Sequence, residues 1–272
     1  MERIKDWISR FDIDGLRLAH CTCMDIHFQK SLRYFTGQMK AEFFLLGDVK
    51  KGDPLRYINA ETLQAICNYD FYQNLVRAFN EKNFYPLAEG LRKNEEYLLK
   101  CNTFLENPRT DRIATVIEDK KNLYGVYAAL FSLPGRVSLY YGAEYGLTGK
   151  KEEDEEALLS SGLTKEEYTP DRFTSFVAKL SEIHGKNSEL QNGQYKEVYL
   201  DHRLYAFLRI DENSGVLSVL NNDEMDQFIR LSIPLRARIA FDLFTQDEVE
   251  IGYDGKLRVF CPAHSGRLIK VK

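Results

Sequence analysis

Short apolar runs alternate with longer amphipathic windows over the first two thirds of the chain, and this alternation restricts the fold more than any other feature. The strand-length runs lie at residues 14–19 and within EFFLLGD, ETLQAICNYD, KCNTFLEN and RVSLYYG. The helical windows lie at residues 4–9, 28–39, 69–79, 86–99 and 120–133. Runs that are apolar almost throughout suit strands buried on both faces, so the pattern predicts an α/β fold of parallel βαβ units.

The sequence changes character after about Asn187. From Tyr195 onward, short alternating runs are separated by the turn-rich segments DENSG, NND and YDG, and YDG at residues 253–255 is a good hairpin signal. We therefore predict an α/β domain over residues 1–187 and an all-β domain over residues 188–272. The acidic run GKKEEDEEALLSSG between the strand-rich parts is predicted to be a solvated loop.

Composition excludes several classes of partner. The formal net charge of −4 offers no basic footprint for nucleic acid. There is no run of 18 or more apolar residues to span a membrane, and residues 1–20 lack the pattern of a signal peptide. Five cysteines, an odd number, do not indicate a disulfide framework. Reduced thiols predict a cytoplasmic protein.

One cluster has the residue types of a metal site. His20, Cys21, Cys23, Asp25 and His27 are crowded into eight positions after the first apolar run. Their spacing does not match the Cys-x₂-Cys to Cys-x₄-Cys pattern of common zinc sites. We interpret the cysteines as packing residues and predict neither a metal nor a cofactor.

The segments that end the apolar runs carry a family resemblance. DGLRLAH, FFLLGDV, NYDF, FLENPRTDRI and LPGRVSLYYGAEYGLTGKK occur in this order. Together they resemble the ends of strands four to eight in the α-amylase family, glycoside hydrolase family 13, especially its neopullulanase and maltogenic-amylase members. Five parallel strands alone fit either an open sheet or part of a barrel. The resemblance, from about residue 4 to 187, implies a partial (β/α)₈ TIM-type barrel followed by an antiparallel β-sandwich.

The same resemblance implies that the catalytic positions are degenerate. Retaining glycoside hydrolysis needs a carboxylate nucleophile and a carboxyl acid about 5 Å apart, and the family adds a third carboxylate. Here the nucleophile position is Ala19, the acid/base position is Asp48 in place of Glu, and the third carboxylate position is Arg109. A methyl group cannot attack, and Asp48 is one methylene shorter, about 1.5 Å. We therefore expect an inactive copy of the enzyme.

Other positions that match the family motifs carry the residue types that the family has there. Arg17, Tyr69 and Asn107 correspond to sugar-contacting positions, although the same side chains also serve to buttress strand ends. The ligand that the resemblance implies is an α-glucan or maltooligosaccharide. Three hypotheses remain: an inactive hydrolase of carbohydrate metabolism, a non-catalytic sugar-binding or protein-interaction module, and a truncated gene product without a settled role.

The strand count has a further consequence. A closed barrel has no free edge, but five strands leave one edge at residues 15–18 and another at 137–140. Unpaired edges template pairing with other chains. We also expect Leu16, Leu45 and Leu139 to lose part of the barrel core. The sequence thus predicts self-association, or a separate partner that supplies strands one to three.

Overall fold

The computed structural model describes residues 1–50, 53–151, 169–212, 214–235 and 239–272. Its helices are α1 (Glu2–Phe11), α2 (Ile26–Met39), α3 (Tyr69–Asn80), α4 (Tyr85–Lys93), α5 (Ile113–Val116), α6 (Leu123–Ser132), α8 (Arg172–Lys186) and α9 (Ser188–Asn192). Its first five strands are β1 (Gly15–Leu18), β2 (Phe44–Gly47), β3 (Ala65–Cys67), β4 (Cys101–Phe104) and β5 (Arg136–Ser138). The later strands are β6 (Gln194–Leu200), β7 (Leu204–Asp211), β8 (Ser214–Asn221), β9 (Gln227–Leu231), β10 (Ala240–Asp242), β11 (Leu257–Cys261) and β12 (Ser265–Val271).

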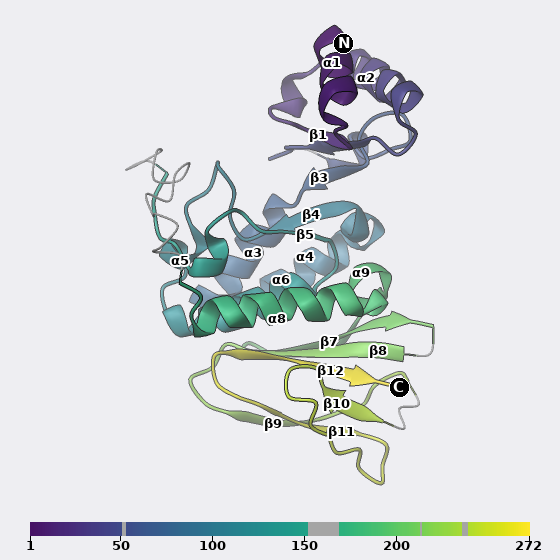
Figure 1. Cartoon of the computed structure of the whole chain (residues 1–272). Coiled ribbons are helices and arrows are strands. Elements are labelled where there is room, and N and C mark those ends of the chain that lie inside the picture. Colours follow the sequence, from purple (N-terminus) through teal and green to yellow (C-terminus); the bar gives the residue numbers. More distant parts are fainter. Residues whose placement is uncertain (51–52, 152–168, 213, 236–238) are drawn as a thin grey trace.

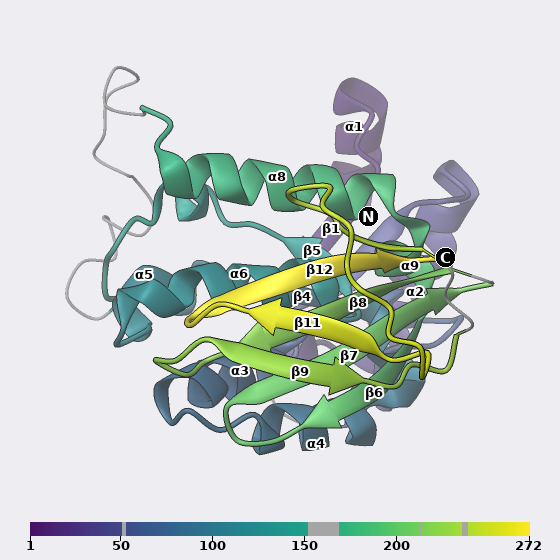
Figure 2. The ribbon, with the colours of Figure 1, turned by 90° about the horizontal axis from the view of Figure 1, so that it is seen from below.

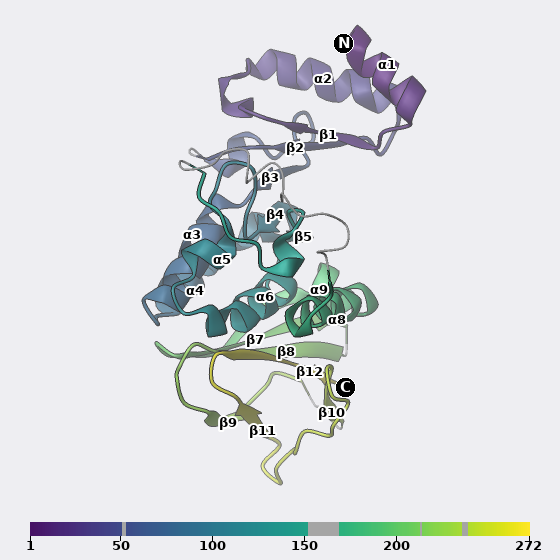
Figure 3. The ribbon, with the colours of Figure 1, turned by 60° about the vertical axis from the view of Figure 1, so that its left-hand side comes forward.

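The five predicted strands form one parallel sheet in the order β1-β2-β3-β4-β5, as the apolar runs indicate. Helices α1 and α2 lie at one end of the molecule and the antiparallel strands at the other, with α3 to α6 and α8 between them (Figure 1). Figure 3 shows the parallel strands following one another from that N-terminal end toward the middle. The acidic run predicted to be a solvated loop lies, from residue 152 on, outside the described residues.

Helix limits follow local capping chemistry. The Asp25 carboxylate accepts the N–H groups of His27 and Phe28 and begins α2, and the Asn68 side chain accepts the N–H of Phe71 and begins α3. The predicted helix at 86–99 is shorter than expected, because α4 ends at Lys93 and a 3₁₀ segment follows. Asn94 stands at this break, a residue type whose side chain competes with helical hydrogen bonds.

Helix α6 forms the centre of the main apolar core. All of its residues except Tyr124 are buried, and it packs between α8 on one side and β12 on another. The contact with β12 is close: a Cβ atom built on Gly266 would lie 2.4 Å from the Cβ of Ala128. The α/β part and the antiparallel part therefore share one continuous core through α6.

The parallel sheet is curved. The guanidinium of Arg136 on β5 lies 4.9 Å from the ring centroid of Phe44 on β2, although β3 and β4 separate these two strands. Side chains alternate between the faces of a strand, so Leu46 shares the concave face with Phe44. Leu45 points the other way, toward the helices, and is fully buried. The prediction that Leu45 loses barrel core is therefore wrong, whereas Leu139, at 39% exposure, is only partly covered.

Both edges of the parallel sheet lack a second neighbour in the described part of the chain. Strand β1 pairs with β2 alone, and β5 pairs with β4 alone. This arrangement agrees with the edge positions expected from the strand count. It leaves backbone N–H and C=O groups at two sites available for a further strand.

The remaining strands form two antiparallel sheets. One has the order β10-β12-β8-β7-β6 and the other pairs β11 with β9. The two sheets share an apolar cluster that includes Leu217, Leu231 and Val259, and Figure 2 shows β9 and β11 in front of the larger sheet. The predicted YDG turn is present between Ile251 and Leu257, with Gly255 at a φ of +73°. Before β6, the chain first forms the short helix α9.

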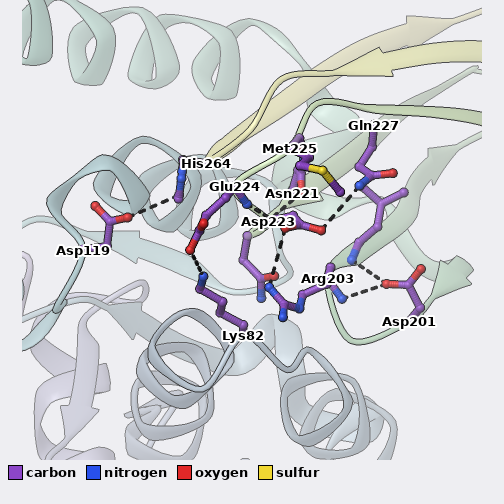
Figure 4. Close-up of polar contacts among 12 residues, drawn as sticks. Lys82, Asp119, Asp201, Arg203, Asn221, Asp223, Glu224, Met225, Gln227 and His264 are labelled. Atoms are coloured by element: carbon purple, nitrogen blue, oxygen red, sulfur yellow. Dashed lines mark hydrogen bonds and ion pairs between the residues drawn. The ribbon is translucent and has the colours of Figure 1, made fainter.

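Polar contacts also join the two parts of the molecule. Lys82, just after α3, forms an ion pair with Glu224 in the segment after β8 (Figure 4). On the neighbouring loop, His264 Nδ1 lies 3.7 Å from the Asp119 carboxylate. These contacts lie beside the β12 strand that packs on α6, so they reinforce the apolar junction.

A buried ion pair closes the opposite end of this junction. The Lys270 Nζ on β12 lies 2.5 Å from Glu189 Oε1 on α9 and 3.0 Å from Asn187 Oδ1. Burial opposes ionisation of Glu189, but hydrogen bonds from Lys270 and Ser214 outweigh it and hold the pKa of Glu189 below its ordinary value. The pair thus stabilises the folded state above the ordinary Glu pKa of about 4.3.

Lys270→Met should lower the free energy of unfolding by about 3 kcal/mol, because the Glu189 carboxylate stays buried without its cation. Urea denaturation at neutral pH measures this loss. The double variant Glu189→Gln/Lys270→Met should recover most of it. Since the pKa of Glu189 is lowered, the pair's contribution disappears as the pH falls through that value, and the single variant should then approach the parent. A double variant no more stable than Lys270→Met would contradict the assignment.

Candidate functional site

Asp48 is the residue around which the carboxyl ends of the parallel strands converge. It follows Gly47, the last residue of β2, and its N–H donates to the Leu18 carbonyl of β1 at 3.1 Å. Glycine before it leaves room for close packing, because a Cβ at position 47 would lie 2.3 Å from Leu63 Cδ1 and would force that side chain to move. The Asp48 side chain is completely buried.

Three side chains engage the Asp48 carboxylate: Arg17 and Tyr69 donate hydrogen bonds to it, and Arg109 forms an ion pair with it. Arg17 Nη2 lies 3.1 Å from Oδ2, Arg109 Nε lies 3.0 Å from the same oxygen, and the Tyr69 hydroxyl donates to Oδ1 at 2.7 Å. Arg17 belongs to β1, Tyr69 begins α3 directly after β3, and Arg109 follows β4. One buried carboxylate therefore connects four neighbouring strand ends. We call these four side chains the Asp48 cluster.

The position of Arg109 depends on a tight turn. In the segment NPRT, the Thr110 N–H donates to the Asn107 carbonyl at 3.1 Å, with Pro108 in the second position that type I turns favour. The Asn107 side chain accepts the Arg109 N–H at 2.8 Å and donates to the Tyr69 hydroxyl at 3.3 Å. Asn107 thus orients both Arg109 and Tyr69.

Tyr69 is held as a hydrogen-bond donor. Burial, and then its hydrogen bond to Asp48, raise the pKa of the Tyr69 phenol well above its ordinary value. The Lys50 Nζ lies 5.4 Å from the centroid of the same ring. Burial and the nearby cations Lys151 and Arg109 lower the pKa of Lys50. Cations are therefore concentrated on this side of the cluster.

A cavity of about 310 Å³ opens beside Tyr69. Its walls include Lys50, Asn68, Asp70, Gln73 and Tyr97. A wider cavity of about 770 Å³ lies elsewhere, against α6, α8 and the antiparallel strands. Only the smaller one adjoins the Asp48 cluster.

A second buried carboxylate lies nearby but faces another way. Glu106 follows β4 and accepts from Arg112 Nη1 at 2.7 Å and from the Ile113 N–H at 2.6 Å. Burial raises the pKa of Glu106 in spite of these donors. The two neighbouring side chains therefore have different partners: Glu106 contacts Arg112, whereas Asn107 contacts Tyr69.

The structure thus brings together five of the six residues singled out from the sequence: Arg17, Asp48, Tyr69, Asn107 and Arg109. Ala19 lies exposed just beyond β1 and supplies no polar group. Sequence reasoning missed the direct contact between Arg109 and Asp48. A signal was available: Arg109 is a cation that follows one strand end, and Asp48 is a carboxylate that follows another, so an ion pair between them could have been expected.

The residues considered for zinc have other roles. Cys21 is fully buried, burial raises its pKa to about 11, and Asp25 caps α2. Within the described ranges, no group of three or more His, Cys, Asp or Glu residues is arranged to hold a metal ion. No helix in the same ranges is long and apolar enough to cross a membrane.

Comparison with known proteins places this geometry in context. A cyclomaltodextrinase from Thermoanaerobacter pseudethanolicus is 24% identical over 242 residues, covering 85% of this chain and 41% of the relative. An intracellular maltogenic amylase from Bacillus subtilis is 26% identical over 158 residues, covering 54% of this chain and 26% of the relative. The chain therefore spans less than half the length of these curated relatives.

Solved structures of α-amylases have a similar fold. An α-amylase from Anoxybacillus superposes with a TM-score of 0.86 at 25% identity, over 99% of this chain and 61% of that one. An α-amylase from Geobacillus thermoleovorans superposes with a TM-score of 0.87 at 21% identity, over 100% of this chain and 62% of that one. The model of the α-amylase catalytic domain matches residues 1–189. The chain therefore belongs to the α-amylase family of glycoside hydrolases.

Proposed function

We propose that this chain is an α-amylase-family homologue that has lost glycoside hydrolysis at the strand-end site. In this proposal the parallel sheet corresponds to strands four to eight of a (β/α)₈ barrel, and the antiparallel sheets correspond to the sandwich that follows it. The single observation that carries the proposal is the Asp48 cluster, in which the carboxylate at the acid/base position is fully buried and bound by two guanidinium groups.

The chemistry explains why this arrangement does not suit hydrolysis. A retaining enzyme needs one carboxylate to attack the sugar and a carboxyl group to protonate the leaving oxygen. Ala19 stands at the nucleophile position and has only a methyl group. Both oxygens of Asp48 are engaged by Arg17, Arg109 and Tyr69, so neither is presented to a substrate. Arg109 itself occupies the third carboxylate position.

An inverting mechanism meets the same obstacle. It requires a second carboxylate as base, about 6.5–9.5 Å from the acid, with room for water between them. A buried carboxylate elsewhere at the strand ends, Glu106, is 2% exposed and already accepts from Arg112 and the Ile113 N–H. Its oxygens are therefore held by structural partners and are not presented as a base.

The proposed ligand class is an α-glucan or maltooligosaccharide. The family supports it, as do solved relatives in complex with acarbose and with maltose. Tyr69 and Asn107 would be the sugar-facing groups left at the site. We also propose a cytoplasmic location, which the free cysteines and the similarity to an intracellular maltogenic amylase of Bacillus subtilis support.

A second candidate is a non-catalytic interaction module that reuses the fold. The observation that favours it is the pair of sheet edges, β1 and β5, each with one strand neighbour among the described residues. Either edge accepts a further strand, from a second copy of this chain or from a partner that supplies the remaining barrel strands.

The purified chain should show no turnover of a chromogenic maltooligosaccharide during a day of incubation. The reason is the missing nucleophile at Ala19 and the occupied carboxylate of Asp48. Removal of a protease nucleophile costs about 10⁶ in rate, which sets the scale of the expected loss. Turnover that follows the protein through purification and disappears in Asp48→Ala would overturn the proposal.

Asp48→Asn should lower the free energy of unfolding by about 2 kcal/mol, because hydrogen bonds to a charged group contribute about 1.5–3 kcal/mol and part of this is screened at the exposed arginines. Urea denaturation measures the change. Asp6→Asn is the matched control, since Asp6 forms an exposed pair with Arg10 and its loss should cost less than about 1 kcal/mol. Equal effects at both positions would show that the Asp48 cluster is not a structural tie.

The purified chain should self-associate at micromolar concentration through its open edges. Size-exclusion chromatography with light scattering gives the mass. Lys residues placed on an edge strand discourage pairing, so Leu16→Lys on β1 should shift the population toward monomer, whereas Tyr253→Lys on the distant, fully exposed turn should not. A sharp monomer at every concentration, with a cooperative melt, would contradict the prediction.

A further inference from the structure

The strand-end site has an unusual charge arrangement for a family that acts on neutral sugars. The guanidinium groups of Arg17 and Arg109 both contact Oδ2 of Asp48, and that carboxylate lies fully buried beneath them. Lys50 adds a third cation over the Tyr69 ring. Lys151 stands next to this group, and its backbone N–H donates to Asp111 at 2.8 Å. Asp48 alone cannot neutralise these cations.

The arginines keep donor capacity for a ligand. Arg109 uses Nε for Asp48, and its side chain is 21% exposed, whereas Arg17 uses Nη2 and is 36% exposed. Among the described residues, the terminal guanidinium nitrogens of Arg109 have no further hydrogen-bond partner, whereas Arg17 also hydrogen-bonds the Cys67 side chain. A planar guanidinium fork suits phosphate oxygens.

The cations also act on one another. The pKa of Lys50 is lowered by burial and then by the charges of Lys151 and Arg109, which Asp48 only partly offsets. A bound anion would remove this repulsion and would strengthen each interaction as a charge-assisted hydrogen bond. Two other carboxylates lie in the surroundings: Asp111, which accepts from Lys151, and Asp70 across the cavity. In the described part of the chain, the carboxylate that pairs with Arg17 and Arg109 is Asp48.

We propose that the Asp48 cluster, together with Lys50 and Lys151, binds a phosphate monoester, with the phosphate at the cations and the carrier in the adjoining cavity. The cavity volume of about 310 Å³ is at the lower end of the usual range for ligand pockets. Asn68, Asp70 and Gln73 line it with the amide and carboxylate groups that bind hydroxyls. A phosphorylated monosaccharide therefore fits both parts, and free phosphate shares the anionic part.

This inference concerns the same site at which we propose that glycoside hydrolysis has been lost. It rests on the proposed function in one respect only: a ligand must be able to reach the cations. Its test is isothermal titration of the full chain with glucose 6-phosphate, glucose and inorganic phosphate. Glucose 6-phosphate should bind, and glucose should bind at least tenfold more weakly. Binding should weaken with added salt, because it depends on charge.

The variant Lys50→Gln should weaken glucose 6-phosphate binding about tenfold, and Lys151→Gln should weaken it to a smaller extent. Lys50 is exposed and Lys151 is half-buried, and within the described ranges neither side chain contacts the Asp48 carboxylate, so both variants should keep the fold. Lys93→Gln is the control: this exposed lysine ends α4 and precedes β4, so it lies toward the opposite end of the sheet. A cooperative thermal melt for each variant shows that it is folded.

The outcomes separate the two proposals. Inorganic phosphate that binds as tightly as glucose 6-phosphate, with the same dependence on Lys50, supports the site and identifies free phosphate as its ligand. Maltose binding without glucose 6-phosphate binding overturns the inference and leaves the proposed glucan ligand intact. Binding that is unchanged in Lys50→Gln and Lys151→Gln also overturns it. Turnover of maltooligosaccharide, measured separately, bears only on the proposed loss of hydrolysis.

Discussion

The buried carboxylate of Asp48 is the interaction on which the parallel half of the molecule depends. A charge removed from water must be met by donors, or its burial becomes very costly. Here the two donors come from β1 and from the start of α3 after β3, an ion-pair partner comes from the turn after β4, and Asp48 itself follows β2. Four short strands, each of three or four residues, are thereby held at their carboxyl ends. The Arg136 and Phe44 contact restrains the other end of the concave face.

This arrangement connects the proposed loss of catalysis with stability. A working site of the family would place carboxylates at three positions around one substrate, and like charges in proximity repel one another. In this chain a methyl, a buried aspartate and an arginine stand at those positions. The Arg109 cation binds the Asp48 anion directly. The proposed change therefore replaces a set of mutually repelling carboxylates with an ion pair.

The positions of the five parallel strands were predictable because each apolar run is bounded by turn residues and is too short for a helix. The chain order of the sheet followed from the family motifs. The turn at NPRT was not predicted, although asparagine and proline suit its first two positions. The direction of Leu45 was not predictable, because a one-residue change in phase moves a side chain to the other face. The contact between Arg109 and Asp48 depends on the curvature of the sheet, which no local pattern encodes. The break at Asn94 reflects a balance between α and 3₁₀ hydrogen bonding that helical periodicity does not resolve.

Helix α6 is apolar on nearly every side, and its cover includes β12, which the chain supplies more than a hundred residues later. At translation speeds of about 5–20 residues per second, the helix waits on the order of 10 s for that strand. Throughout this interval an apolar surface without its final cover is present on the nascent chain. The surface is open to contacts with other chains until β12 docks, so dilution from denaturant should favour aggregates whenever β12 docks slowly.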